Sequence, residues 1–344
     1  MPAVVLIGAS AVWAPRPARV SAGGASVGEY SSAIVYNGQA QDFYYDSTNT
    51  LLGHAWYSGG WHTETLDGAG GSNGAETASV GTDNSAVIYN GQLQDFYRDT
   101  THGTLRHAVW TGSSWFFESL DGPSVTGGNG RTGDSVGQYN SAVIYNGQLQ
   151  DFYFDLSNGL MRHAVWTGSG WFFESLDGPS VSGGNGRTSN FVGGYNDAVI
   201  YHGQLQDFYY DSSTSLLRHA VWIGSTWFFE SLDGTGVGGG NGRIGDSVGQ
   251  FNSAVIYSGQ LQDFYYDSSN DLLRHAVWTG STWFFESLDG TGAGGGNGRT
   301  TDGVGSNDSA VIYNTQLQDF YFDGTNGSLR HATYAAGWFF ETIA

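Results

Sequence analysis

Hydrophobic and polar positions alternate over short stretches throughout the chain, and turn-forming residues separate these stretches. In one representative part, the alternating segments are residues 85–89, 93–99, 105–110 and 115–120, with Asn90-Gly91 between the first two. A period of two predicts β-strands, and Asn-Gly predicts a two-residue hairpin turn. No stretch shows the 3.6-residue apolar period of a helix. The pattern therefore predicts a meander of four short strands and no helices.

This four-strand unit recurs along the chain. The tetrapeptide Gln-Asp-Phe-Tyr starts six times, and its starts are 53, 56, 56, 56 and 56 residues apart. A His-Ala pair and then a Trp-x-x-Glu segment follow each copy. Copies of one unit at a fixed spacing indicate a repeat architecture, in which each unit buries its faces against its neighbours.

Four-stranded units of this length are typical of β-propeller blades. We therefore predict an all-β fold, a six-bladed β-propeller of four-stranded antiparallel blades. Packing around an axis buries both faces of a blade, which explains aromatic residues at odd and even positions alike. The predicted propeller covers residues 24–344, with blades at about 24–77, 78–133, 134–189, 190–245, 246–301 and 302–344.

Residues 1–23 lie outside the repeat, and the stretch 4–13 is apolar. Two interpretations stay open. The segment is the remnant of a secretory signal, with Val20-Ser21-Ala22 as a cleavage-like site, or it adds a strand to the ring. The first interpretation predicts a secreted protein. How the ring closes is left open by both.

The composition of the chain excludes several classes of binding partner and of chemistry. The chain has 12 Lys+Arg against 32 Asp+Glu, a net charge of −20, which disfavours nucleic acid and anionic membranes. It has no run of 18 apolar residues, so no membrane insertion is predicted. It also has no Cys, which excludes disulfides and thiolate chemistry. With 20 Phe, 20 Tyr and 12 Trp, the chain is too aromatic to be disordered.

Hairpin pairing assigns side chains to the two faces of a blade. In the second copy, Trp110 is expected opposite Trp115, and His107 opposite Glu118 and Phe96. One face then carries Asp95, Tyr97, Arg106, Trp110, Trp115 and Phe117, and the other carries Tyr89, Gln94, Phe96, His107, Phe116 and Glu118. The cleft between two blades would hold a guanidinium, a carboxylate, an imidazole and aromatic rings. That mixture suits the hydroxyls and the C–H face of a neutral sugar.

A structural interpretation stands beside this one. The Asp of Gln-Asp-Phe-Tyr and the His of His-Ala occur in every copy, as buried hydrogen-bonded struts would. The Arg is replaced by Gly53 in the first copy, which favours a ligand-binding role. The recurring Glu fits a structural or a ligand-binding role. Ring packing accounts for the Trp that recurs at Trp110, Trp166, Trp222 and Trp278.

The unit resembles that of the PLL-like bacterial lectins and the six-bladed fungal fucose-specific lectins. The resemblance rests on Leu-Gln-Asp-Phe-Tyr-Tyr-Asp, Leu-Arg-His-Ala-Val-Trp, Gly-Ser and Trp-Phe-Phe-Glu, and it covers every copy. It implies a multivalent lectin that binds fucose or related sugars between blades, through an Arg, a Glu and aromatic rings. The implied sugar-binding residues are Arg106, Trp110, Glu118, Arg162, Trp166, Glu174, Arg218, Trp222, Glu230, Arg274, Trp278, Glu286, Arg330, Tyr334 and Glu341. Because alternation puts Arg106 and Glu118 on opposite faces, a bulge in the fourth strand is needed to unite them.

Catalysis needs a single constellation of groups, and here most reactive side chains belong to the repeat. We therefore expect no enzymatic activity, no cofactor and no metal. The loop Gly127-Gly128-Asn129-Gly130 is read as a flexible connector. The alternatives to a lectin are a protein-interaction propeller and an accessory binding module of a secreted cell-wall enzyme. The oligomeric state is not predicted.

Overall fold

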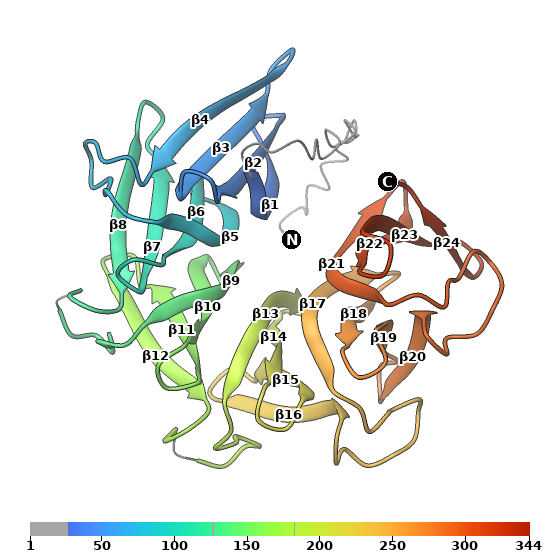
Figure 1. The fold of residues 1–344 in the computed structure, drawn as a ribbon. Coiled ribbons are helices and arrows are strands. Elements are labelled where there is room, and N and C mark those ends of the chain that lie inside the picture. Colours follow the sequence, from blue (N-terminus) through green and yellow to red (C-terminus); the bar gives the residue numbers. More distant parts are fainter. Residues whose placement is uncertain (1–26, 126, 182) are drawn as a thin grey trace, which may run out of the picture.

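The computed structural model describes residues 27–125, 127–181 and 183–344, so the predicted segment 1–23 lies outside the described residues. These residues form six four-stranded antiparallel sheets, each with its strands in chain order (Figure 1). Sheets of this kind around a central axis form a β-propeller, which confirms the predicted fold class. Within the described ranges, no helix has the length and apolar character needed to span a bilayer.

The strands follow the predicted meander in every blade. Blade 1 consists of β1 (Val27–Tyr36), β2 (Gln39–Asp46), β3 (Leu51–Tyr57) and β4 (Trp61–Asp67), and blade 2 of β5 (Val80–Tyr89), β6 (Gln92–Asp99), β7 (Thr104–Trp110) and β8 (Trp115–Asp121). Blade 3 consists of β9 (Val136–Tyr145), β10 (Gln148–Asp155), β11 (Leu160–Trp166) and β12 (Trp171–Asp177), and blade 4 of β13 (Val192–Tyr201), β14 (Gln204–Asp211), β15 (Leu216–Trp222) and β16 (Trp227–Gly234). Blade 5 consists of β17 (Val248–Tyr257), β18 (Gln260–Asp267), β19 (Leu272–Trp278) and β20 (Trp283–Gly290), and blade 6 of β21 (Val304–Tyr313), β22 (Gln316–Asp323), β23 (Ser328–Tyr334) and β24 (Trp338–Thr342).

The turns of a blade lie at its two ends, because its strands are antiparallel. The turns after the first and third strands lie at the hairpin-turn end; in blade 2 they are residues 90–91 and 111–114. The turn after the second strand and the connector to the next blade lie at the connector end; in blade 2 they are residues 100–103 and 122–135. The first strand of each blade lies nearest the axis (Figure 1).

The hydrophobic core lies between blades rather than within them. One cluster joins Phe96 and Leu105 of blade 2 to Tyr153 and Trp171 of blade 3, and the other clusters join neighbouring blades in the same way. We call this contact surface of two neighbouring blades a seam. In blades 2 to 5 both faces are therefore apolar because both are buried, as the repeat predicts.

The predicted strand pairing is confirmed in blade 2. His107 lies opposite Glu118 and opposite Phe96, and Trp110 lies opposite Trp115. A bulge shifts the register beyond this point, so that Leu105 pairs with Asp121. The faces of the blade follow from the two-residue alternation, as expected.

The glycine-rich connectors are anchored to the next blade. In the connector after blade 2, the Asn129 carbonyl accepts the N–H of Phe173 on β12 at 2.8 Å. Gly130 follows with φ of +84°, and a Cβ there would lie 1.8 Å from the Phe173 carbonyl oxygen. The same backbone bond is made by Asn73, Asn185, Asn241 and Asn297. The expectation of a flexible loop was therefore wrong, because this bond fixes the connector on the outer strand.

The six blades form an arc whose two ends are not packed together (Figure 1). In the five other seams, the first Trp of an outer strand packs edge-on against the preceding blade, as Trp171 does against Phe96 at 5.7 Å and His107 at 5.5 Å. Trp61 holds this position in blade 1 and is 48% exposed. Among the described residues, the seam between blades 6 and 1 is therefore open.

Candidate functional site

The arginine that recurs in blades 2 to 6 lies inside the seams, at the connector end. Arg106 is 1% exposed, and its Nη2 lies 2.8 Å from Oδ2 of Asp67 in blade 1. Its Nη2 also donates to the Gly74 carbonyl, and the Tyr97 hydroxyl donates to the same Asp67 oxygen. The equivalent pairs are Arg162–Asp121, Arg218–Asp177, Arg274–Asp233 and Arg330–Asp289. Each guanidinium thus neutralises a buried aspartate of the preceding blade.

The structure does not bring the expected arginine–glutamate pairs together. Arg106 lies opposite Ser119, whereas Glu118 lies opposite His107 and faces the other neighbouring blade. The bulge found in the outer strand falls between the partners of Leu105 and Arg106, so it does not unite the pair. A sugar-binding role for the five arginines stays a prediction; their observed contacts are those of seam ion pairs.

Blade 1 departs from this arrangement, and the packing explains why. Gly53 takes the place of the arginine, and a Cβ there would lie 2.4 Å from the ring of Tyr44. The Tyr44 ring thus fills space that the guanidinium takes in the other blades. No described blade packs on this face, so no buried aspartate there requires a cation.

The aspartates of the Gln-Asp-Phe-Tyr units are buried with few partners. Asp207 on β14 is 0% exposed, and both of its carboxyl oxygens lack a hydrogen-bond partner among the described residues. Burial, with smaller contributions from neighbouring carboxyls, raises the pKa of Asp207 well above its ordinary value. The carboxyl therefore stays protonated where an ordinary aspartate would be ionised. Asp95, Asp151, Asp263 and Asp319 are equally buried.

A second recurring arrangement lies at the hairpin-turn end of the seams. Between blades 5 and 6, His275 Nδ1 lies 3.0 Å from Glu286 Oε1, and His275 Nε2 lies 2.8 Å from Gln262 Oε1. The Trp338 indole N–H donates to the same Glu286 oxygen at 3.3 Å. The histidine is buried, whereas 36% of the glutamate side chain is exposed. The cleft therefore presents a carboxylate and aromatic rings to solvent.

These contacts set the charge of the cleft. Burial acts to raise the pKa of Glu286, but the hydrogen bonds from His275 and Trp338 outweigh it and the pKa is lowered. Burial lowers the pKa of His275, and Glu286 opposes this only in part. At neutral pH an ionised glutamate thus lies beside a neutral imidazole.

Some of the predicted sugar-binding residues meet in this cleft. Between blades 5 and 6 it forms a cavity of about 350 Å³ whose walls include His275, Glu286, Tyr334 and Trp338, while Arg274 lies outside this lining, in the seam ion pair. Glu118, Glu174, Glu230 and Glu341 bond the histidine of their own blade in the same way. Trp110, Trp166, Trp222 and Trp278 each lie 5.5 Å from the first Trp of the outer strand. A role for these residues in binding a sugar stays a prediction.

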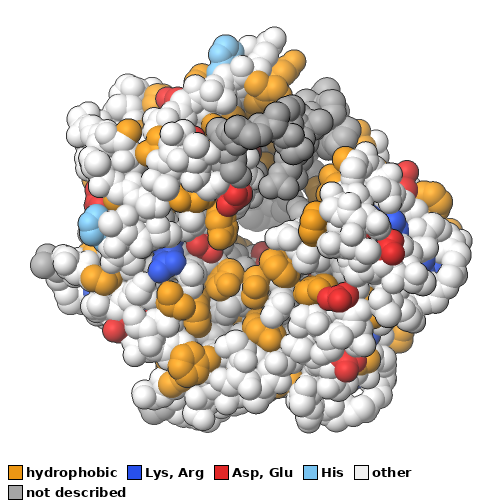
Figure 2. All heavy atoms as spheres, viewed as in Figure 1, with side chains coloured by type: hydrophobic (Ala, Val, Ile, Leu, Met, Phe, Trp, Pro, Cys, Tyr) orange, Lys and Arg blue, Asp and Glu red, His pale blue; other side chains and the backbone are white. Residues whose placement is uncertain are grey.

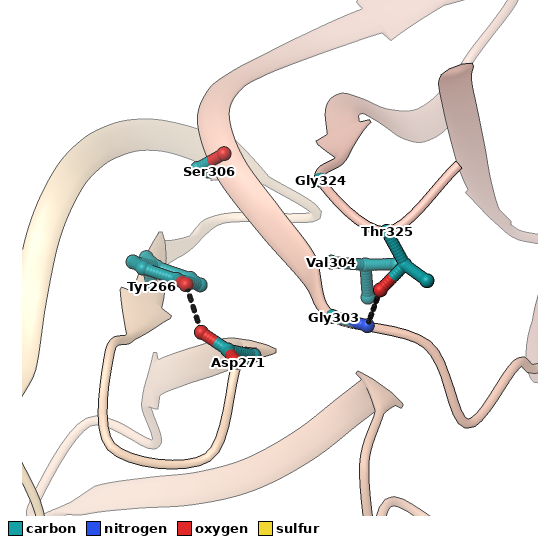
Figure 3. A pocket seen from close by; sticks show the side chains of 7 residues that line it. All are labelled: Tyr266, Asp271, Gly303, Val304, Ser306, Gly324 and Thr325. Carbon is teal, nitrogen blue, oxygen red and sulfur yellow. Dashed lines mark hydrogen bonds between the residues drawn. The ribbon is translucent and has the colours of Figure 1, made fainter. Parts of the chain in front are cut away.

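A different cavity, of about 290 Å³, lies at the connector end of the same two blades (Figure 3). Its lining residues are Tyr266, Asp271, Gly303, Val304, Ser306, Gly324 and Thr325. The Tyr266 hydroxyl donates to Asp271 Oδ1, and the Gly303 N–H donates to the Thr325 hydroxyl at 2.8 Å. Tyr266 is half-buried and Asp271 is exposed. A small ligand in this cavity would therefore meet a phenol and a carboxylate that already share a proton.

At this position of the unit, a tyrosine meets a carboxylate in blade 5 and in no other described blade. The counterparts of Asp271 are Thr50, Gly103, Gly159, Ser215 and Gly327. The hydroxyl of Tyr210, the counterpart of Tyr266 in blade 4, contacts the hydroxyls of Ser215 and Ser247. Burial, and next the hydrogen bond to Asp271, raise the pKa of Tyr266. The phenol is therefore neutral and points its proton at the carboxylate.

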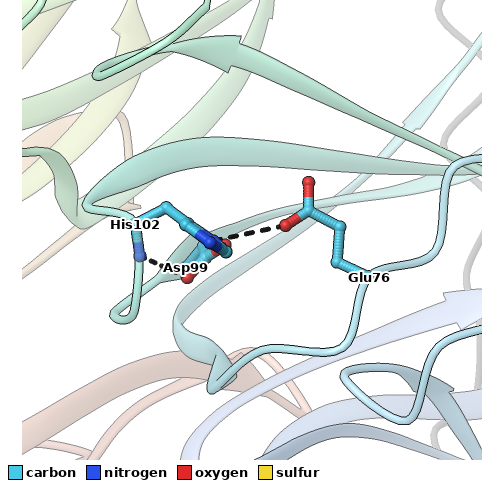
Figure 4. A group of neighbouring side chains, drawn as sticks. All are labelled: Glu76, Asp99 and His102. Atoms are coloured by element: carbon cyan, nitrogen blue, oxygen red, sulfur yellow. Dashed lines mark hydrogen bonds and ion pairs between the residues drawn. The ribbon is translucent and has the colours of Figure 1, made fainter.

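One further group, in the seam between blades 1 and 2, brings a histidine and two carboxylates together (Figure 4). Their ligating atoms lie within 4.8 Å of one another, a spacing that a metal ion could use. His102 Nδ1 lies 2.6 Å from Asp99 Oδ2 and 3.4 Å from Glu76 Oε2. Asn270 bridges two aspartates in the same way in blade 5. Hydrogen bonding thus accounts for the group, and we assign it to the seam.

Sequence reasoning missed the residues that interrupt the repeat. Asp271 and Asp308 replace the residue types found at their positions in the other units, and so do Asp83 and Arg98 of blade 2. An alignment of the six units shows these departures directly. Reasoning from recurring residues passes over them, although they mark the places where one blade carries a group that the others lack.

No protein-family model matches the sequence, and no curated protein matches it closely enough to count as a relative. Solved structures do share the fold. The Hadza microbial sialidase Hz136 gives a TM-score of 0.51 at 11% identity, over 92% of this chain and 65% of that one. A GH43_1 enzyme from Xanthomonas citri gives 0.42 at 12% identity, over 76% and 90% of the two chains. A thermostable family-43 glycoside hydrolase gives 0.43 at 10% identity, over 94% of each.

At these identities the likeness concerns the propeller fold, and it corrects two expectations. The predictions of a multivalent, fucose-type lectin and of a chain without enzymatic activity are contradicted, because the Hadza microbial sialidase, an enzyme, shares this propeller fold. The physical reason for the error is that the strand pattern behind the resemblance specifies blades, and blades support many functions.

Proposed function

We propose that this protein cleaves glycosidic bonds, with the reaction in the connector-end cavity between blades 5 and 6. The observation that carries the proposal is the Tyr266–Asp271 hydrogen bond in a cavity, at a position where only blade 5 has a carboxylate. A reaction needs one constellation of reactive groups in a concave site. The seam and cleft contacts recur from blade to blade, whereas this pair does not. The sialidase of the same fold is a precedent for the reaction class, and no residue is carried over from it.

The two side chains have complementary roles. A phenol is a weak nucleophile until a base removes its proton, and tyrosine nucleophiles occur among glycosidases. In the first step, the Tyr266 oxygen bonds to the anomeric carbon while its proton passes to Asp271. The departing sugar oxygen takes that proton as the glycosidic bond breaks. Water then attacks the same carbon, Asp271 accepts the proton of the water, and the released Tyr266 oxygen regains it.

The proposed substrates are neutral glycans. The net charge of −20 repels anionic sugars, and Asp271 adds a carboxylate at the mouth of the cavity. The hydroxyls of Ser306 and Thr325 line the same cavity and can exchange hydrogen bonds with sugar hydroxyls. The exposed carboxylate can also accept from two sugar hydroxyls.

The variants Tyr266→Phe and Asp271→Asn test these roles, because each removes one reactive atom and keeps the shape of the side chain. We expect kcat/KM for aryl glycosides of neutral sugars to fall by about 10²- to 10⁴-fold in each variant. Tyr210→Phe, at the matching position of blade 4, is the control and should retain the activity. Circular dichroism of all three variants checks that the propeller is folded.

Mass spectrometry gives a second readout. An aryl 2-deoxy-2-fluoro glycoside should add the mass of one sugar to the peptide that contains Tyr266, and Tyr266→Phe should prevent this. The proposal fails if the chain hydrolyses none of the glycosides, or if both variants keep full activity.

A further inference from the structure

The inner strands carry bulky residues in a strained backbone conformation. The fourth residue of each inner strand has a positive φ, and the six residues are Tyr30, Asp83, Tyr139, Tyr195, Phe251 and Asn307. Their φ values lie between +53° and +59°. Asn and Asp tolerate this region, but an aromatic residue there strains the backbone. The four aromatic residues are therefore kept at an energetic cost, which calls for a role of their side chains.

Three of these aromatic residues form a continuous row across blades 3, 4 and 5. The ring centroids of Tyr139 and Tyr195 are 4.4 Å apart, and those of Tyr195 and Phe251 are 4.6 Å apart. The Phe251 ring in turn contacts Tyr266 edge-on at 6.1 Å. The row therefore leads directly to the tyrosine of the connector-end cavity.

The row is bounded by polar residues at both ends. In blade 2 the fourth residue of the inner strand is Asp83, whose Oδ1 accepts the Tyr139 N–H at 3.0 Å. In blade 6 the fourth residue of the inner strand is Asn307. The next residue, Asp308, has no hydrogen-bond partner for either carboxyl oxygen among the described residues. Three consecutive blades thus carry rings where the flanking blades carry polar groups.

The row lies at the surface of the central hollow. Its three residues are half-buried, so they are not sealed within the core. Figure 2 shows hydrophobic side chains gathered around the central opening over β13 and β17, the strands of Tyr195 and Phe251. The rings are tilted against one another by 37° and 54°, and Tyr139 and Tyr195 each carry a hydroxyl. Such a ledge offers apolar contact to the C–H groups of a sugar and hydrogen bonds to its hydroxyls.

We infer that the row Tyr139–Tyr195–Phe251 is a binding ledge for an extended neutral glycan, several sugars of which lie along it while one enters the cavity beside Tyr266. This inference rests on the proposed function and names its substrate class: a linear oligosaccharide or polysaccharide rather than a single terminal sugar. Contacts along such a ledge add the binding energy of sugars that do not react, which positions the reacting bond.

Packing is the competing explanation, because neighbouring aromatic rings also stabilise one another. The variant Tyr195→Asn separates the two roles. Asn accepts the positive φ without strain, so the free energy of unfolding should change little, because the lost ring contacts and the relieved strain offset each other. A ledge would still lose its central ring and hydroxyl.

The test is isothermal titration calorimetry with cello-, manno- and xylo-oligosaccharides of two to six sugars. The full-length Asp271→Asn variant serves as the background, so that hydrolysis does not interfere. For at least one of the three series, we expect the affinity to rise with chain length and to fall at least tenfold when Tyr195→Asn is added. Phe228→Asn is the matched control, because Phe228 is an exposed ring on outer strand β16 and should not affect binding.

Each outcome decides a separate point. Affinity that is independent of chain length, no binding of any of the three series, or binding unchanged by Tyr195→Asn overturns the ledge. Length-dependent binding lost in Tyr195→Asn supports it even if the wild-type chain hydrolyses nothing, in which case only the proposed function fails. Hydrolysis lost in Tyr266→Phe, with oligosaccharide binding unaffected by Tyr195→Asn, leaves the proposed function standing without the ledge.

Discussion

A buried guanidinium stabilises a fold only while its carboxylate partner is present. Arg218 is 5% exposed, lies 3.2 Å from Asp177 of the preceding blade and also donates to the Gly186 carbonyl. Arg218→Ala leaves Asp177 buried and uncompensated, so we expect the free energy of unfolding to fall by about 3–5 kcal/mol. Urea unfolding followed by circular dichroism measures the change. The double variant Arg218→Met, Asp177→Asn should lose less, and an equal loss would contradict an ionic seam.

For single residues, the sequence predicts which residues lie opposite one another within a blade, but not which residues meet across a seam. The pairing of His107 with Glu118 follows from a hairpin turn and the two-residue alternation of strands. The partner of Arg106 does not, because Asp67 precedes it by 39 residues and only the packing of two blades brings it near. Asp271 was overlooked for another reason: it departs from the repeat, and its meaning depends on Tyr266 beside it.

At the scale of elements, the connectors are the parts that pattern reasoning misjudged. Glycine-rich segments between strands usually indicate flexibility, whereas here a glycine lets the connector approach the next outer strand. The cause is local: a Cβ at Gly130 would lie 1.8 Å from the Phe173 carbonyl oxygen. The strands themselves were predictable, because alternation and turn residues are properties of contiguous sequence.

The close approach of Gly130 to the Phe173 carbonyl leads to a specific prediction. Gly130→Ala places a methyl group against backbone and requires a positive φ, so we expect it to lower the free energy of unfolding by more than about 2 kcal/mol. Hydrogen exchange of the Phe173 amide should accelerate as its bond to Asn129 is lost. Gly133→Ala in the same connector is the control, since a Cβ there meets nothing within 4 Å. Equal effects of the two substitutions would show that the connector is not anchored.

At the scale of the whole molecule, buried carboxyls set the pH dependence of stability. Burial raises the pKa values of Asp95, Asp151, Asp207, Asp263 and Asp319 well above the ordinary one. The folded chain therefore keeps protons that the unfolded chain releases above a pH of about 4. The stability that these groups contribute is complete below that pH and declines as pH rises toward their folded pKa values. The lowered pKa values of Glu118, Glu230 and Glu286 act in the opposite sense, since the stability that these residues contribute is lost as pH falls below about 4.

We therefore expect the free energy of unfolding, measured in urea, to be higher at pH 4.5 than at pH 7. Each carboxyl that is protonated only in the folded state contributes a slope of about 1.4 kcal/mol per pH unit. Asp207→Asn removes one such group and should reduce the slope by about that amount. A stability that is flat or rising over this range would show that the carboxyls are ionised in the folded protein.

The unjoined ends of the arc determine how the molecule would respond to force. Among residues 27–344 as described, blades 1 and 6 each pack on one neighbouring blade, whereas the blades between them pack on two. Tension applied across residues 27 and 344 would thus detach an outermost blade first and expose a new outermost blade behind it. Each rupture would release one repeat of 56 residues, or roughly 190 Å of extended chain. Such a molecule lengthens in near-equal steps, where a sealed ring would have to break open before any blade could leave.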